Sequence, residues 1–134
     1  MANYLLDCNH LSPALRKTSK LRNRIEQRRL AGDRFVCCHP VLCELEAGIQ
    51  HTPKPDENRR QLSHLLNHIR LWPLDRDTSR QYGSIYLELR RKGRVLSQVD
   101  IMLAALARQH KLTLLTSDLD FQALPDLTLE DWTV

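Results

Sequence analysis

Tyr4-Leu5-Leu6-Asp7 is a short apolar run that ends in an acid, and this pattern guides the interpretation of the whole chain. Apolar runs of this length, bounded by polar residues, are typical of strands buried in a sheet. The pattern returns at Leu114-Leu115-Thr116-Ser117-Asp118. Further strands are predicted over residues 35–38 and 127–129, with another candidate over 71–74.

Segments with the apolar spacing of helices separate these strands. We expect helical structure after Asn9, where Ser12-Pro13 gives a first-turn signal, and helices over 19–30, from Pro40 onward, across 62–69, over 77–91 and from Ser97 onward. Strands that alternate with helices favour a parallel sheet with right-handed crossovers. The predicted fold class is therefore α/β: one domain over residues 1–134, with a Rossmann-like, mostly parallel sheet of four to five strands flanked by helices.

Four acids occur where such a sheet would gather them. Asp7 and Asp118 each follow a predicted strand, Glu44 lies on the helix after the second strand, and Asp100 opens an apolar helix. Open α/β sheets collect ligands at the carboxyl ends of their strands. Because four carboxylates would repel one another without a cation, the set indicates a metal site.

Each acid also has a purely structural interpretation. Asp7 could cap the helical segment after it, and Asp100 ends the Ser-x-x-acid pattern of a capping box that starts at Ser97. Glu44 could simply lie in solvent, and Asp118 could open a turn. Only the set of four, rather than any single acid, points to a functional site.

The ligand types favour magnesium over zinc. Magnesium prefers oxygen ligands and keeps several of its waters, so carboxylates together with a substrate phosphate suit it. His64 and His68 are four residues apart but lack a third ligand or the H-E-x-x-H glutamate, so we expect them on the surface. The four cysteines form no C-x-x-C pair and are expected to be reduced thiols, with Cys37-Cys38 packed in a strand.

The formal net charge of +4 is unevenly distributed. Basic residues crowd the segment 16–34, a second group is Arg90, Arg91, Lys92 and Arg94, and no Lys or Arg follows Lys111. This fits either contacts to a phosphate backbone beside an acidic pocket or simply solvated helix faces. No apolar stretch approaches the roughly 20 residues of a membrane span, and no secretory pattern opens the chain, so we expect a cytoplasmic protein.

Several segments stand in an order and spacing that match a known family: Tyr4-Leu5-Leu6-Asp7-Cys8-Asn9, the Glu44 helix with Gly48, Asp100-Ile101-Met102-Leu103-Ala104-Ala105, and Leu114-Leu115-Thr116-Ser117-Asp118-Leu119-Asp120-Phe121 followed by Leu129-Glu130-Asp131-Trp132. Through them nearly the whole chain resembles PIN-domain ribonucleases, and more narrowly the VapC-type toxins of bacterial toxin-antitoxin systems. The stretch Glu88-Leu89-Arg90-Arg91-Lys92-Gly93-Arg94 is similar to the subgroup that cuts initiator tRNA.

The resemblance implies a set of site residues. Asp7 and Asp100 would bind Mg²⁺, with Mn²⁺ as an alternative ion, and Glu44 and Asp118 would complete the catalytic acidic pocket. Thr116 or Ser117 would position a water or an acid. Two departures stand out: Cys8 occupies a position that is usually Thr, and relatives often have Asn at Asp118, so that Asp120 competes for the fourth place.

The activity implied by the resemblance is metal-dependent hydrolysis of RNA phosphodiesters, with tRNA as the expected substrate. The implied partners are a cognate VapB-type antitoxin, which would bring an Arg or Lys into the acidic pocket, and a second copy of the chain in a homodimer. The alternative is a catalytically silent module of the same fold that binds RNA or a protein partner. Such a module would bind RNA with strong salt dependence but give no product with magnesium or manganese.

Overall fold

β1 (Asn3–Leu6) is the central strand of a five-stranded sheet in the order β3-β2-β1-β4-β5. The other strands are β2 (Arg34–Cys37), β3 (Arg70–Leu71), β4 (Thr113–Leu115) and β5 (Thr128–Glu130). Every neighbouring pair is parallel, so all five carboxyl ends lie at the same edge of the sheet. This computed structural model covers residues 1–134 and confirms the predicted α/β class with a parallel sheet.

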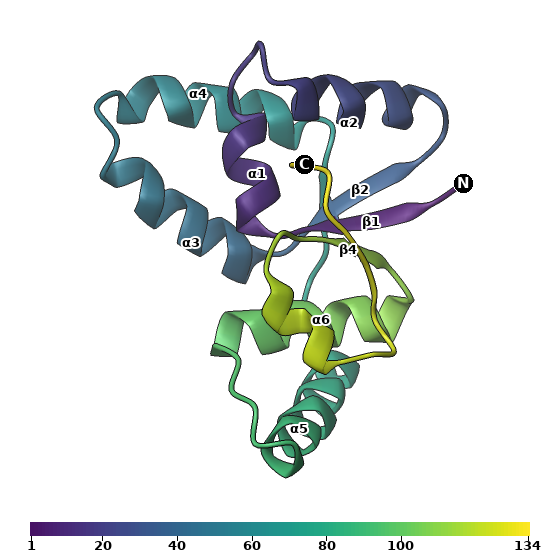
Figure 1. The fold of residues 1–134 in the computed structure, drawn as a ribbon. Helices are drawn as coiled ribbons and strands as arrows, with labels where there is room; N and C mark the ends of the chain where they lie inside the picture. Colours follow the sequence, from purple (N-terminus) through teal and green to yellow (C-terminus); the bar gives the residue numbers. More distant parts are fainter.

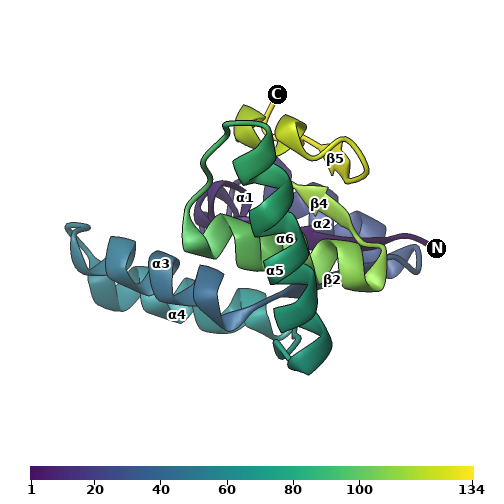
Figure 2. The same ribbon diagram turned by 90° about the horizontal axis from the view of Figure 1, so that it is seen from below.

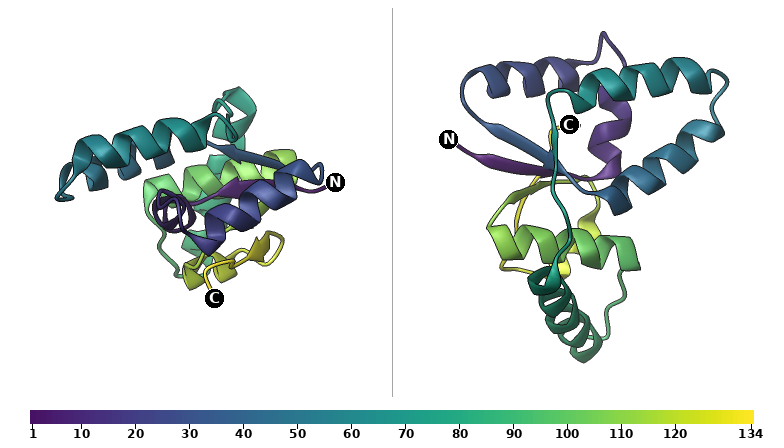
Figure 3. Two further views of the ribbon diagram at one scale, coloured as in Figure 1. Left: turned by 90° about the horizontal axis from the view of Figure 1, so that it is seen from above. Right: turned by 180° about the vertical axis from the view of Figure 1, so that it is seen from behind.

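Six helices and one short 3₁₀ helix connect the strands. They are α1 (Cys8–Ala14), α2 (Lys20–Leu30), α3 (His39–Gln50), α4 (Pro55–Leu66), α5 (Arg76–Arg91), α6 (Gln98–His110) and η1 (Leu119–Ala123). Figure 1 shows α2 and α6 on opposite faces of the sheet. Figures 2 and 3 show α3 and α4 extending beyond the sheet on the side where β1 ends.

The hydrophobic core explains which segments became strands. Leu5, Leu6, Leu114 and Leu115 are fully buried, as the apolar runs predicted. They belong to one cluster of 34 buried apolar residues that spans the sheet and both helical layers. α6 is buried on most of its surface, which agrees with its nearly continuous apolar sequence. No helix combines the length and the apolar character needed to cross a bilayer.

The start of α1 differs from the prediction. Ser12-Pro13 was expected to mark a first turn, whereas the helix begins at Cys8 and Pro13 lies near its end. The reason is that the Asp7 carboxylate accepts a hydrogen bond from the Cys8 N–H at 2.7 Å and caps the helix directly after β1. Pro13 is tolerated because a seven-residue helix has few internal hydrogen bonds to lose.

Candidate active site

Asp7 is the most constrained acid of the predicted quartet. Its residue surface is only 5 % exposed, at the point where the central strand ends. The carboxylate accepts hydrogen bonds from the Cys8 N–H at 2.7 Å, from the Thr116 hydroxyl at 2.8 Å and from the Asn9 side-chain amide at 3.2 Å. A buried carboxylate requires such donors, because water no longer solvates it. The structural interpretation of Asp7 as a helix cap is therefore correct, and it is compatible with a functional role.

Thr116 and Asn9 connect the ends of β1 and β4 around that carboxylate. Besides donating to Asp7, the Thr116 hydroxyl accepts from the Asn9 amide at 3.2 Å and from the Asp118 N–H at 3.1 Å. The side-chain Oδ1 of Asn9 accepts from the Ser117 N–H at 3.2 Å. Of the two residues expected to position an acid, Thr116 does so through its side chain. Asn9 was predicted only as a helix signal, and its contact with Asp7 was not expected.

Asp100 lies in the first turn of α6. Ser97 caps the helix by accepting from the Asp100 N–H at 3.1 Å, but the reciprocal bond of a capping box, from the Ser97 N–H to the carboxylate, is absent. Burial, followed by the charges of Asp7, Asp118 and Glu44, raises the pKa of Asp100 to about 6, although a hydrogen bond with the Ser97 side chain lowers it. The Asp100 carboxylate therefore lies within the electrostatic influence of the other three acids.

Glu44 approaches the same space from α3. Its side chain is exposed and has no hydrogen-bond partner in the chain. Partial desolvation, followed by the charge of Asp7, raises the pKa of Glu44. An acid that is unpaired within the chain and repelled by a neighbouring carboxylate is available to a cation.

Asp118 is the acid of the last segment whose charge reaches Asp100. It adds to the rise in the pKa of Asp100, after the larger effects of burial and of Asp7. The Asp118 carboxylate also accepts from the Asp120 N–H at 2.9 Å and so caps η1. Asp120 itself is exposed. The assignment of Asp118 to the fourth place of the site stays a prediction.

The four acids interact through their charges without enclosing an ion-sized space. No three His, Cys, Asp or Glu side chains form a group that could hold a metal ion in the present arrangement. The donor set nevertheless fits a hard cation, because it consists of carboxylate oxygens. Burial, followed by the acidic neighbours, raises the pKa of one of these groups, Asp100. Magnesium sites commonly use one or two carboxylates and complete the shell with waters and phosphate, so three protein ligands are not required.

Cys8 and His10 are the other titratable side chains next to Asp7. Burial, followed by the charges of Asp7 and Glu44, raises the pKa of the Cys8 thiol to about 11, so it is neutral. His10 is fully buried, and its Nε2 accepts from the Trp132 N–H at 2.9 Å while its Nδ1 lies 2.8 Å from the Asn9 Oδ1. Burial lowers the pKa of His10 despite the nearby Asp131. A neutral His10 can therefore donate from Nδ1 to Asn9 and fix the amide that contacts Asp7.

Four of the eight basic residues in the segment 16–34 make contacts within the chain. Arg22 donates to the Gln61 side chain, Arg24 lies 3.9 Å from the centre of the Trp132 ring, and Arg28 pairs with Asp33. Arg29 pairs with Glu26. Much of this charge thus supports the fold, in agreement with the interpretation as a helix face.

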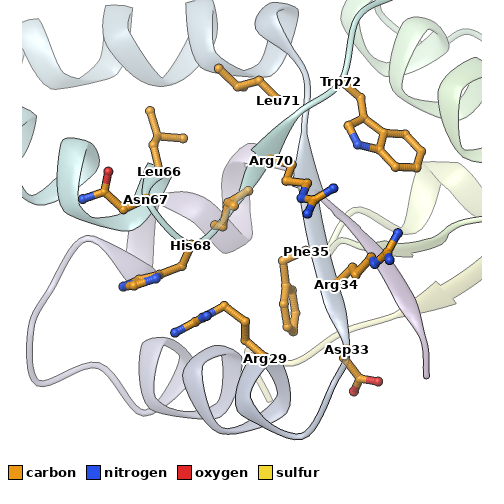
Figure 4. A pocket seen from close by; sticks show the side chains of 11 residues that line it. Arg29, Asp33, Arg34, Phe35, Leu66, Asn67, His68, Arg70, Leu71 and Trp72 are labelled. Atoms are coloured by element: carbon orange, nitrogen blue, oxygen red, sulfur yellow. The ribbon is translucent and has the colours of Figure 1, made fainter.

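The predictions for the remaining ligand types are confirmed. His64 and His68 are exposed, all four cysteines are free thiols, and Cys37 and Cys38 are buried. A cavity of about 720 Å³ lies at the opposite, amino edge of the sheet, between α2, β2 and β3 (Figure 4). It is lined by Arg29, Arg34 and Arg70 among others, and none of the four acids reaches it.

Comparisons with known proteins agree with this arrangement. The family model described as "PIN domain" matches residues 4–127. Ribonuclease VapC2 of Rickettsia felis is 28 % identical over 132 residues, which are 96 % of this chain and 97 % of the relative. The tRNA(fMet)-specific endonuclease VapC of Salmonella typhimurium is 26 % identical over 134 residues, covering 98 % and 99 %. The crystal structure of VapBC2 from Rickettsia felis bound to a promoter DNA fragment contains a chain with a TM-score of 0.86 and 26 % identity, with 97 % and 98 % covered.

Proposed function

This chain belongs to the PIN domain family, and from that premise we propose that it is a VapC-type ribonuclease, the toxin of a toxin-antitoxin pair. The proposed activity is metal-dependent endonucleolytic hydrolysis of RNA. The observation that carries the proposal is the meeting of acids from distant segments: Thr116 and Asn9 hold the buried Asp7 carboxylate at the strand ends. The charges of Asp7, Asp118 and Glu44 add to burial in raising the pKa of Asp100. That the chain matches its curated VapC relatives along nearly their whole length supports it further.

In the proposed site Asp7 and Asp100 would hold Mg²⁺, or Mn²⁺, and Glu44 and Asp118 would complete the acidic pocket. When bound, the ion would lower the pKa of a water and offset the charge on the phosphoryl oxygens. Thr116 and Asn9 hold the Asp7 carboxylate in one orientation, which prepares that ligand before the substrate arrives. No side-chain nucleophile is needed, since water attacks the phosphorus.

We propose tRNA as the substrate. The Salmonella relative is named for tRNA(fMet), and the basic stretch 88–94 resembles that subgroup. This stretch is the end of α5 and the beginning of the segment that leads to α6, the helix that carries Asp100. A cytoplasmic location would accompany such a substrate.

We propose two protein partners. Solved structures similar to this chain are VapBC complexes, which supports a VapB-type antitoxin as the first. An Arg or Lys of the antitoxin would pair with the acidic quartet, since a cation there relieves the repulsion among Asp7, Glu44, Asp100 and Asp118. The second partner is another copy of the chain, in a homodimer.

The test is RNA cleavage by purified protein, with Asp100→Asn as the decisive variant and Asp120→Asn as the matched control. We expect wild-type protein and Asp120→Asn to cleave tRNA only with Mg²⁺ or Mn²⁺, and Asp100→Asn to lose at least about a hundredfold in rate. Sequencing the 5′ ends of the fragments would define the cleavage position. Metal-dependent cleavage by Asp100→Asn at the wild-type rate would refute the site.

The same assay distinguishes the alternative of a silent RNA-binding or partner-binding module. Such a module would bind RNA, weakly at high salt, and yield no fragments with either ion.

A further inference from the structure

A cavity of about 350 Å³ lies between α5, α6 and the linker that joins them, and none of the four acids lines it. Its floor is apolar and well packed: Leu89, Leu96 and Ile101 are each no more than 8 % exposed. Sites for small ligands have volumes of roughly 300–1,000 Å³, so the cavity can accept a planar group of modest size.

The rim of this cavity carries two exposed side chains with apolar surface. Tyr86 is 46 % exposed and Val95 is 87 % exposed. Arg90 donates to the Tyr86 hydroxyl at 3.1 Å and its guanidinium lies 5.8 Å from the ring centre. These contacts hold the ring in place before any ligand binds.

The rim also carries an unpaired cation. Arg94 lines the cavity and is exposed, and its side chain makes no hydrogen bond or ion pair within the chain. By contrast, nearby Lys92 is engaged with Glu88 and with the Ala123 carbonyl oxygen. Arg94 is thus free to bind an anion beside the aromatic ring.

The cavity and the acidic quartet share the first turn of α6. Ile101, in the cavity floor, directly follows Asp100, and Leu96 directly precedes the helix cap Ser97. Figure 1 shows the linker running from the end of α5 to the amino end of α6. The cavity and the proposed acidic site are thus connected through consecutive residues of α6.

We propose that this cavity is a subsite for one unpaired nucleobase of single-stranded RNA, stacked on Tyr86, with a neighbouring phosphate paired to Arg94. Proteins that bind single strands combine aromatic platforms with backbone cations in this way. A protein chain that covered the same apolar rim would also have to supply an acid for Arg94. A single-stranded RNA provides a base for Tyr86 and a phosphate for Arg94 in every nucleotide. The inference rests on the proposed ribonuclease function and adds a substrate position to it.

The experiment uses full-length protein in EDTA, so that no RNA is cut, and a single-stranded uridine hexamer with one internal 2-aminopurine as the probe. Stacking quenches the fluorescence of 2-aminopurine. The extent of quenching therefore measures whether the base stacks on the ring, and a titration with protein measures the affinity for the hexamer. Tyr86→Ala should abolish the quenching and weaken binding about tenfold. Tyr86→Phe should keep the quenching. The matched control is Leu87→Ala, which removes a neighbouring exposed apolar side chain outside the cavity.

The cation is tested in parallel. Arg94→Ala should weaken binding and lower the slope of log affinity against log salt by about one, because one phosphate contact is lost. Arg80→Ala, an exposed arginine near the other end of α5, should change neither. Thermal unfolding of all variants verifies that they are folded.

The outcomes distinguish failure of the proposed subsite from failure of the proposed ribonuclease function. If wild-type protein cleaves RNA but Tyr86→Ala binds and quenches like wild type, the subsite is wrong and the ribonuclease function stands. If Tyr86→Ala retains RNA binding but loses binding of the antitoxin, the cavity is a protein interface and the proposal is overturned. If wild-type protein neither binds the hexamer nor cleaves RNA, both proposals fail.

Discussion

The Thr116 hydroxyl lies 2.8 Å from the Asp7 carboxylate, although the two residues are 109 positions apart in the sequence. Thr116 is 4 % exposed and Asp7 is 5 % exposed, so water cannot replace the bond. The contact fastens the end of β4 to the end of β1, at the edge where the four acids meet.

Replacing Thr116 with Val should therefore affect both stability and activity. The substitution leaves Asp7 with one donor fewer in a buried position, which costs about 1–3 kcal/mol in the free energy of unfolding. Loss of an orienting contact to a ligand typically lowers activity about 10- to 100-fold. Thr113→Val, on the same strand but without a side-chain hydrogen bond, is the control for unfolding and cleavage. Equal effects of the two variants would contradict the assigned role of Thr116.

Asp100→Asn should stabilise the metal-free protein, but only above about pH 4. The folded pKa of Asp100, about 6, exceeds the ordinary value of 3.8, so the folded state binds more protons between these values. Stability from this group is consequently present at low pH and lost as the pH rises through 6. Because Asp100 is only half buried, we expect a gain of about 1 kcal/mol at pH 7 and none at pH 4. Denaturant unfolding in EDTA at both pH values measures this, with Asp120→Asn as the control.

His10 should produce the opposite pH dependence. Burial lowers its folded pKa below 6.5, so its contribution to stability is present at neutral pH and is lost as the pH falls below 6.5 through the folded pKa. His10→Leu removes this dependence and leaves the Trp132 N–H without its acceptor, at a cost of about 1–3 kcal/mol at pH 7. The exposed His64→Leu serves for comparison. An unchanged acid slope in His10→Leu would show that another group titrates.

Two glycines on the α5–α6 hairpin should respond with opposite signs to alanine. Gly93 has a φ of 65°, where an L residue is strained, so Gly93→Ala should destabilise by about 1 kcal/mol. Gly83 lies inside α5 with open space around its Cβ position, so Gly83→Ala should stabilise by roughly 0.5–1 kcal/mol. Thermal unfolding of the two variants side by side tests the difference, and the same sign in both would be inconsistent with this backbone geometry.

Much of the fold could be predicted from local patterns. Apolar runs identified the strands β1, β2, β4 and β5 to within about two residues, and helical spacing identified α2, α3, α5 and α6. For α1, helical structure was predicted after Asn9 with Ser12-Pro13 in its first turn, whereas Asp7, the acid that follows β1, caps the helix and Pro13 lies near its end. Asp7 and Asn9 were both possible caps for this helix in the sequence. Which of them caps it depends on where β1 ends.

The candidate site was predictable in outline but not in its contacts. A parallel sheet brings strand ends together, so the four acids could be listed from their positions after strands. Asn9, His10 and Trp132 were not recognised, because their roles depend on pairs such as His10 and Trp132 that are 122 positions apart. One feature of the sequence pointed to Asn9: an amide two residues after a buried acid.

The central position of β1 has a consequence for synthesis. β1 is made first, yet one of its neighbours, β4, begins at Thr113. Contacts between segments this distant in the chain form late, because the intervening polypeptide must exist before they can close. While the ribosome is still translating residues before 113, Asp7 lacks both Thr116 and Asp118. A nascent chain therefore cannot complete the proposed site until residues 113–118 have emerged from the exit tunnel.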